Sequence, residues 1–230
     1  MEDNNKKVSI ILSVYNAQNT IGDAIESILN QTYDNIELLI LNDKSNDNTQ
    51  KIIETFDSKK IKVFKNKKNL GLTKSLNILI NHSEGEYIAR QDADDVSFKN
   101  RLEKQIKLLE DKNLDFCTSR AKIKKTNKTI PRFSNYFSPY LVSKFKNPFI
   151  HGTLLIKKSS LLNIGLYDEK FYYAQDYKLF VDMLQNNYKF EIIKHPLYLL
   201  NMKNNLSEKF GLEQNYYADC VRKGMIPNKS

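Results

Sequence analysis

Four short apolar stretches alternate with amphipathic segments along the first half of the chain. The first, VSIILSV at 8–14, is almost continuously apolar, as expected of a strand buried on both faces. Similar stretches occur at 36–41, 61–66 and 86–91, and the segments between them repeat apolar residues at helical spacing. Strands that alternate with helices form parallel sheets covered by helices. The pattern therefore predicts an α/β fold.

Polar residues follow each of these predicted strands at its end. The carboxyl ends of parallel strands lie at one edge of the sheet, and ligands bind beyond that edge. We therefore expect the polar residues to share one rim, formed by Tyr15, Asn16, Asn42, Asp43, Lys68, Asn69, Asp92, Asp94 and Asp95.

The acidic run ARQDADDVS at 89–97 places three carboxylates within four positions of a chain whose formal net charge is +9. Mg²⁺ and Mn²⁺ prefer oxygen ligands, and magnesium commonly combines one or two carboxylates with phosphate and water. A divalent cation would also offset the repulsion among the aspartates. The other interpretation is a helix N-terminus, where Asp95 or Ser97 would stabilise the helix dipole. The run alone leaves both interpretations open.

Other residues on the expected rim suit a nucleotide. Tyr15 offers an aromatic face to a base, and Asp43 offers an acceptor to the N–H of a pyrimidine. Lys68 and Arg90 offer positive charge to phosphate. Each residue also has an ordinary structural interpretation: Tyr15 as a surface tyrosine, Asp43 as a capping residue, and the lysine and arginine as solvated basic side chains. Their shared position favours a nucleotide site.

The second half of the chain has a mixed pattern. Strands are expected at 115–123, 151–158 and 188–201, and a helix around 179–184. The stretch 126–146 is irregular, with prolines and scattered aromatic residues. Polar residues with interspersed aromatics make up the tail, which we expect to be partly helical or loosely packed.

Composition narrows the class of protein. No apolar run has the length of a signal peptide or the ~20 residues of a membrane span, so we expect a cytosolic protein. Cys117 and Cys220 are far apart, as expected of free thiols in a reducing compartment. The charge of +9 admits a nucleic acid, anionic lipid, a polyanionic small substrate or a merely solvated surface.

The chain resembles the family 2 glycosyltransferases in four stretches that follow the family's order over about residues 6–200. They are VSIILSVYNAQNTIGDAIESILNQTYDNIELLILNDKSNDNT, NKKNLGLTKSLN, GEYIARQDADD and IGLYDEKFYYAQDYKLFVDM. The resemblance implies a GT-A-type α/β fold: a Rossmann-like, mostly parallel sheet flanked by helices, with a mixed α+β acceptor-side C-terminal half. The nucleotide-sugar-binding half would span 1–115 and end in the DXD motif. The acceptor-binding half of the same domain would span 116–203, followed by a tail at 204–230.

On the side of the sugar donor, the resemblance assigns a role to each matching residue. Ser13 and Tyr15 would line the nucleoside pocket, and Asp43 would contact the base. Lys68 belongs to the same set of donor-binding residues.

The DXD motif would supply the metal site. Arg90 and Asp92 would approach the ribose and diphosphate, and Asp94 would bind Mn²⁺ or Mg²⁺ with Asp92 as its partner. In this division of labour Asp95 is a supporting or capping residue.

On the side of the acceptor, Asp176 falls where the family places its catalytic base. It would take a proton from an acceptor hydroxyl in a single displacement with inversion. The family pattern is usually Glu-Asp, and here Gln175 replaces the glutamate, so acceptor contacts would differ. His151 would border the acceptor or sugar pocket. Relatives often carry Arg and His after the last strand, where this chain offers only Lys203.

The predicted function is transfer of a sugar from a nucleotide-sugar donor to a glycan or lipid-linked acceptor in cell-surface polysaccharide or lipopolysaccharide synthesis. A UDP-sugar is the favoured donor. Addition of a single sugar is favoured over polymerisation, because the chain ends without the membrane helices of processive synthases. The positive charge suggests peripheral contact with the inner face of an anionic cytoplasmic membrane. The alternatives are a catalytically silent relative that binds a nucleotide sugar, a basic nucleic-acid-binding protein, and an Asp-x-Asp phosphatase. No nucleic acid is expected, because the rim is acidic and the basic residues are dispersed along the chain.

Overall fold

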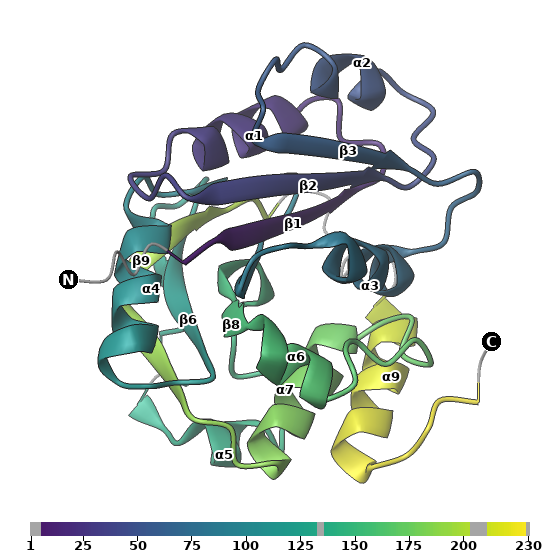
Figure 1. The fold of residues 1–230 in the computed structure, drawn as a ribbon. Coiled ribbons are helices and arrows are strands. Elements are labelled where there is room, and N and C mark those ends of the chain that lie inside the picture. Colours follow the sequence, from purple (N-terminus) through teal and green to yellow (C-terminus); the bar gives the residue numbers. More distant parts are fainter. Residues whose placement is uncertain (1–5, 133–135, 203–210, 229–230) are drawn as a thin grey trace.

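The computed structural model describes residues 6–132, 136–202 and 211–228, and it confirms the α/β alternation of the first half (Figure 1). This half contains the strands β1 (Val8–Val14), β2 (Ile36–Asn42), β3 (Ile61–Lys65) and β4 (Tyr87–Arg90), and the helices α1 (Ile21–Leu29), α2 (Thr49–Ile53) and α3 (Leu72–His82). The four strands are parallel and lie in the order β3-β2-β1-β4. Their carboxyl ends therefore form one edge, as predicted.

The sheet continues into the second half, where strands run in both directions. This half contains β5 (Val96–Ser97), α4 (Arg101–Asp111), β6 (Phe116–Ile123), β7 (Thr129–Ile130), α5 (Pro139–Val142), the 3-10 helix η2 (His151–Thr153), β8 (Leu155–Lys157), α6 (Lys158–Asn163), α7 (Gln175–Gln185), β9 (Phe190–Leu200) and α9 (Gly211–Lys223). Within the described residues the order is β3-β2-β1-β4-β8-β6-β9-β5, with β7 paired to β6. β8 is antiparallel to β4 and β6, whereas β9 is parallel to β6.

One predicted strand is shorter than expected. The segment 151–158 was predicted to be extended throughout, but only β8 is a strand, and His151 lies in η2. Gly152 explains the close approach of this turn to the sheet: a Cβ there would come within 2.7 Å of the Tyr198 hydroxyl on β9. The turn places His151 beside the site instead of within the sheet.

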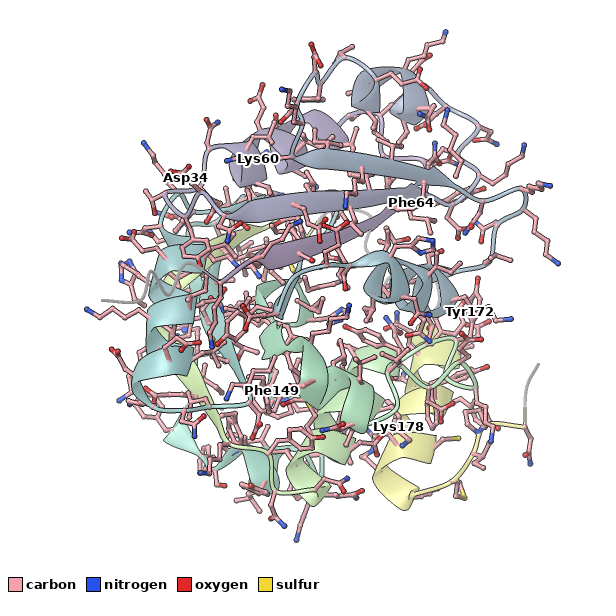
Figure 2. The ribbon with its side chains drawn as sticks, viewed as in Figure 1. Asp34, Lys60, Phe64, Phe149, Tyr172 and Lys178 are labelled. Carbon is pink, nitrogen blue, oxygen red and sulfur yellow. The ribbon has the colours of Figure 1, made fainter. Side chains whose placement is uncertain are left out.

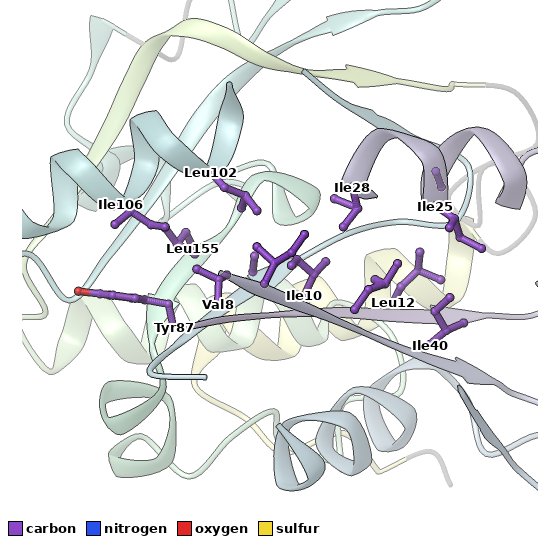
Figure 3. Close-up of a cluster of buried hydrophobic side chains, with 14 of the residues drawn as sticks. Val8, Ile10, Leu12, Ile25, Ile28, Ile40, Tyr87, Leu102, Ile106 and Leu155 are labelled. Carbon is purple, nitrogen blue, oxygen red and sulfur yellow. The ribbon is translucent and has the colours of Figure 1, made fainter. Parts of the chain in front are cut away.

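Both faces of the sheet are buried, which explains why its central strands are apolar throughout. Ile10 of β1 and Ile40 of β2 face the cluster formed with α1 and α4 (Figure 3). Their neighbours Ile11 and Leu41 face the opposite cluster, formed with α3, α6 and α7. Successive side chains of a strand point to opposite faces, so each strand contributes to both layers.

The C-terminal helix α9 packs against α7 through a third, smaller cluster that includes Phe171, Tyr177 and Tyr217 (Figure 1). The predicted tail is thus helical over Gly211–Lys223. Among the described residues, no helix combines the length and the apolar character needed to cross a membrane.

Candidate active site

The loops that follow β1 and β2 are joined to each other at the carboxyl edge. The Asn16 N–H donates to Ser45 Oγ at 3.0 Å, and the Ala17 N–H donates to Thr49 Oγ1 at 2.8 Å. The same edge carries the two residues predicted to line a nucleoside pocket. Ser13 is half-buried at the end of β1, and the Tyr15 side chain is 51% exposed in the next loop. The structure therefore leaves the ring of Tyr15 open to a ligand.

Asp43 holds a third loop in place. Its Oδ1 accepts hydrogen bonds from Asn66 Nδ2 at 2.7 Å and the Leu70 N–H at 2.9 Å, and its Oδ2 accepts from the Gly71 N–H at 2.8 Å. Asp43 is only 2% exposed, whereas Lys68 on the loop that it fixes is exposed. The sequence did not reveal this role in shaping the loop, and contact with a base stays a prediction.

Gly71 connects the loop held by Asp43 to the segment before α7. Its φ of +83° lies in the left-handed region, and a Cβ there would lie 2.6 Å from the Tyr172 ring (Figure 2). Thr73 Oγ1 also donates to the Phe171 carbonyl at 3.0 Å. The beginning of α3 therefore fixes the loop that leads to Asp176.

Gln91 organises the acidic turn from within. Its Nε2 donates to the carbonyls of Asp92 at 3.0 Å and Asp95 at 2.9 Å, and its Oε1 accepts from Ser97 Oγ at 2.7 Å. The interpretation of Asp95 or Ser97 as a helix cap is wrong. Ser97 lies in β5, and Asp95 Oδ1 accepts the Asn201 N–H at 2.7 Å. Asp95 is buried and joins the turn to the end of β9.

Arg90 lies behind the acidic turn. The sequence predicted that it contacts the sugar donor, but the side chain is 1% exposed, because it lies at the end of β4 and turns back towards Ile11 of the neighbouring β1. Its Nη1 donates to the Ile11 carbonyl at 3.3 Å, and its Nη2 donates to Asp92 Oδ1 at 2.5 Å. The guanidinium therefore acts on the rim through Asp92, which is itself partly exposed.

The three carboxylates of the turn repel one another. Burial and the charge of Asp92 raise the pKa of Asp94 to about 6. Burial and the charges of Asp92 and Asp94 raise the pKa of Asp95 to about 8. A cation beside the two partly exposed carboxylates, Asp92 and Asp94, would relieve this repulsion, so the turn fits a divalent metal.

The described residues contain no group of three His, Cys, Asp or Glu side chains placed to hold a metal ion. Asp92 and Asp94 would therefore share the ion with ligand phosphates and water, as magnesium sites commonly do.

Two buried residues that the sequence did not single out support the turn. Arg101, at the start of α4, donates from Nη1 to Ser97 Oγ at 2.9 Å and from Nη2 to the Arg90 carbonyl at 2.9 Å. Its guanidinium lies 5.1 Å from the centre of the Tyr198 ring. The Tyr198 hydroxyl in turn accepts the Asp92 N–H at 3.0 Å.

Asp176 lies in the first turn of α7, where a carboxylate also interacts favourably with the helix dipole. Ala174 precedes the helix with a φ of 54°. The Asp176 carboxylate is half-buried, and its Oδ2 accepts a hydrogen bond from Asn147 Nδ2 at 2.8 Å. Gln175 is 8% exposed, so the structure gives it little surface for the acceptor contact that was predicted.

His151 lies in η2 next to the acidic turn, since a Cβ on the following Gly152 would lie 2.8 Å from Asp92 Oδ2. Its Nε2 is 2.7 Å from the Tyr167 hydroxyl. Burial and the positive charge of Arg90 lower the pKa of His151 to about 4, against the opposing effects of Asp176 and Asp92. Lys203 lies outside the described residues.

These features define a class of protein: an α/β fold with an acidic turn at the carboxyl edge of its parallel strands and a further carboxylate, that of Asp176, at the start of α7. The family described as Glycosyl transferase family 2 matches residues 9–180, and the chain belongs to this family.

Two relatives show how far the similarity extends. The Escherichia coli enzyme UDP-Glc:alpha-D-GlcNAc-diphosphoundecaprenol beta-1,3-glucosyltransferase WfgD is 32% identical over 180 residues, which are 78% of this chain and 70% of that protein. The Bacillus subtilis protein EpsE is 37% identical over 67% of this chain. The chain spans 57% of the length of EpsE.

Solved structures confirm the GT-A-type fold. S. aureus TarS in complex with UDP superposes with a TM-score of 0.75 at 19% identity, over 94% of this chain and 64% of that one. The mannosyltransferase PcManGT from Pyrobaculum calidifontis, solved with GDP-Man and Mn²⁺, gives a TM-score of 0.72 at 19% identity, over 96% of this chain and 66% of that one. At these identities the likeness shows the fold alone.

Proposed function

We propose that the protein transfers a sugar from a nucleotide-sugar donor to an acceptor hydroxyl, with inversion and with the help of a divalent metal. The observation that carries the proposal is that the segment from Asn147 to Gly152 contacts both carboxylates. Asn147 donates to Asp176 Oδ2 at 2.8 Å, and a Cβ on Gly152 would lie 2.8 Å from Asp92 Oδ2. A metal-binding centre and a base on either side of one space are what a single displacement requires.

UDP is the nucleotide that the site supports best. The ring of Tyr15 is exposed for stacking on a base, whereas Asp43 is 2% exposed and would act by shaping the loop that carries Lys68. TarS was solved with UDP and with UDP-GlcNAc, and the name of WfgD specifies UDP-Glc. Lys68 is exposed on the loop fixed by Asp43 and would approach the phosphates.

The metal would be Mn²⁺ or Mg²⁺, held by Asp94 with Asp92 as its partner. When bound, it would supply Lewis-acid stabilisation of the departing diphosphate. Arg90 donates to Asp92 Oδ1 from behind the turn and orients its carboxylate. Gln91 holds the backbone of the turn, so that the two carboxylates keep their positions without a ligand.

Asp176 would take the proton of the acceptor hydroxyl as that oxygen attacks the anomeric carbon. Its half-buried position in the first turn of α7 leaves the carboxylate accessible from the acceptor side. A general base must lie within hydrogen-bonding distance of the hydroxyl whose proton it takes.

The proposed acceptor is a glycan or a lipid-linked sugar, as the name of WfgD suggests. Contact with an anionic membrane at its cytoplasmic face would bring such an acceptor to the site. Its support is a surface of exposed apolar and basic side chains around α5: Phe137, Leu141, Lys144, Phe145 and Lys146. Salt-sensitive flotation with liposomes that contain anionic lipid would be expected, and its absence would remove this part of the proposal.

The central experiment is a screen for UDP release from nucleotide sugars, with and without Mn²⁺. We expect metal-stimulated turnover of at least one UDP-sugar, and loss of turnover in Asp176→Asn with UDP binding retained. Asp182→Asn, on the same helix, is the matched control and should keep full activity. Turnover that metal does not stimulate with any donor would refute the proposed mechanism. Equal turnover in Asp176→Asn would refute the assignment of the base.

A further inference from the structure

We infer that Asn147 is a positioning residue for Asp176, whose amide holds one carboxylate oxygen and leaves the other for the acceptor hydroxyl. The inference rests on the proposed function of Asp176 as the base. Asn147 Nδ2 donates to Asp176 Oδ2 at 2.8 Å. In the part of the chain that the structure describes, no hydrogen bond is made to Asp176 Oδ1.

The orientation of the Asn147 amide is fixed by the backbone. Its Oδ1 accepts the Phe149 N–H at 3.0 Å, which forms a turn closed by the side chain. Because the oxygen is engaged in this way, the NH₂ group is the end that faces Asp176. Pro148 lies inside the turn and restricts its φ, so the turn is stiff.

A second contact keeps this turn in register with α7. The Phe149 ring lies 4.5 Å from the Phe180 ring, centre to centre. Phe180 is four residues after Asp176, so both lie on the same face of the helix. Asn147 and Phe149 therefore contact this face at two points, Asn147 through a hydrogen bond and Phe149 through an aromatic contact.

Phe149 is itself anchored in the core. Its ring centre lies 5.5 Å from that of Phe116 and 5.3 Å from that of Phe190, at the beginnings of β6 and β9. A carboxylate tied to the sheet in this way has one defined free oxygen. General base catalysis requires that oxygen to lie within hydrogen-bonding distance of the acceptor hydroxyl. The expected contribution of Asn147 is therefore to kcat and not to affinity for the sugar donor.

The test uses Asn147→Ser, because a serine hydroxyl can close the same turn but is too short to reach Asp176. With the UDP-sugar that the screen identifies, we expect kcat for UDP release to fall about tenfold or more, the loss expected for a hydrogen bond to a charged group. The KM for the sugar donor should stay within about twofold of the wild-type value. The thermal midpoint should fall only slightly, because Asp176 is half-buried and water can replace the lost amide.

Two further variants separate the possible outcomes. Leu161→Ala, a core position of α6 outside this turn, is the control: it should lower the thermal midpoint but reduce kcat far less than Asn147→Ser. Wild-type kcat in Asn147→Ser, beside an inactive Asp176→Asn, would overturn this inference alone. An equal loss of kcat in Leu161→Ala would show that the loss in Asn147→Ser follows from destabilisation and would also overturn it. Full activity in Asp176→Asn would instead overturn the proposed function.

Discussion

Replacing Arg101 with methionine should destabilise the protein strongly, although Arg101 reads in the sequence as an ordinary basic residue of an amphipathic helix. The side chain is fully buried, so its donors must find acceptors within the protein and not in water. It makes five hydrogen bonds, to Gln105 Oε1, Gln91 Oε1, Ser97 Oγ, and the carbonyls of Arg90 and Leu154. These acceptors belong to α4, the acidic turn, β5, the end of β4 and the beginning of β8.

The magnitude follows from the acceptors that lose their donor. Methionine fills much of the volume of Arg101 but donates nothing. Gln105 Oε1 and the Arg90 carbonyl would stay buried without this partner, and each such loss costs roughly 1–3 kcal/mol. We expect a loss of about 3 kcal/mol or more in the free energy of unfolding. For a domain of this size that is a fall of about 6–12 °C in thermal midpoint.

The assay is urea and thermal denaturation followed by circular dichroism. Lys104→Met, an exposed position on the same helix, is the matched control and should change stability by less than about 0.5 kcal/mol. Arg101→Lys should give an intermediate loss, because its three donors lie on one atom and cannot reach acceptors on both sides. A loss below about 1 kcal/mol in Arg101→Met would refute the reasoning, because relaxation or water would then be satisfying the acceptors.

Three further predictions concern the site. Burial holds the pKa of His151 at about 4, below the unfolded value of about 6.5, so protonation favours the unfolded chain and stability is lost as pH falls between these values. Thermal midpoints from pH 8 to pH 4 should therefore fall less steeply in His151→Gln, and parallel curves would contradict this. Gly71→Ala should cost about 2 kcal/mol in urea denaturation, because it strains a φ of +83° and displaces Tyr172; an unchanged midpoint would show that the loop yields freely. Asp94→Asn should raise the thermal midpoint, because it removes repulsion with Asp92, and abolish the Mn²⁺-dependent part of UDP binding in calorimetry. Retention of that dependence would assign the metal to other groups.

The strands and helices of the first half were predictable because their signals are local. Strand β2 is buried at every position, and its sequence shows this directly. Topology then placed Tyr15, Asp43 and Asp92 on one edge without knowledge of any contact. The role of Asp176 came from the resemblance, since a lone aspartate at a helix start carries no such signal.

The buried side chains that hold the site in place could not be predicted from the local sequence pattern. Tyr198 meets the acidic turn across 106 residues of sequence, and Arg101 reaches Leu154 across 53. Arg90 was misplaced for the same reason: its charge suggested a ligand contact, but it lies at the end of β4 and turns back towards β1, which buries it. Asn147 had one local signal, an Asn-Pro pair that favours a turn, although nothing in it points to Asp176.

The side-chain hydrogen bonds that join the loops after β1, β2 and β3 have a thermodynamic consequence. Ser45, Thr49 and Asp43 accept hydrogen bonds from backbone N–H groups of these loops, so the loops are held by contacts within the protein itself. The entropy of ordering the pocket is thus lost during folding and not during association. Nucleotide binding should therefore show a small heat-capacity change and a fast, nearly temperature-independent on-rate, as expected of a rigid receptor.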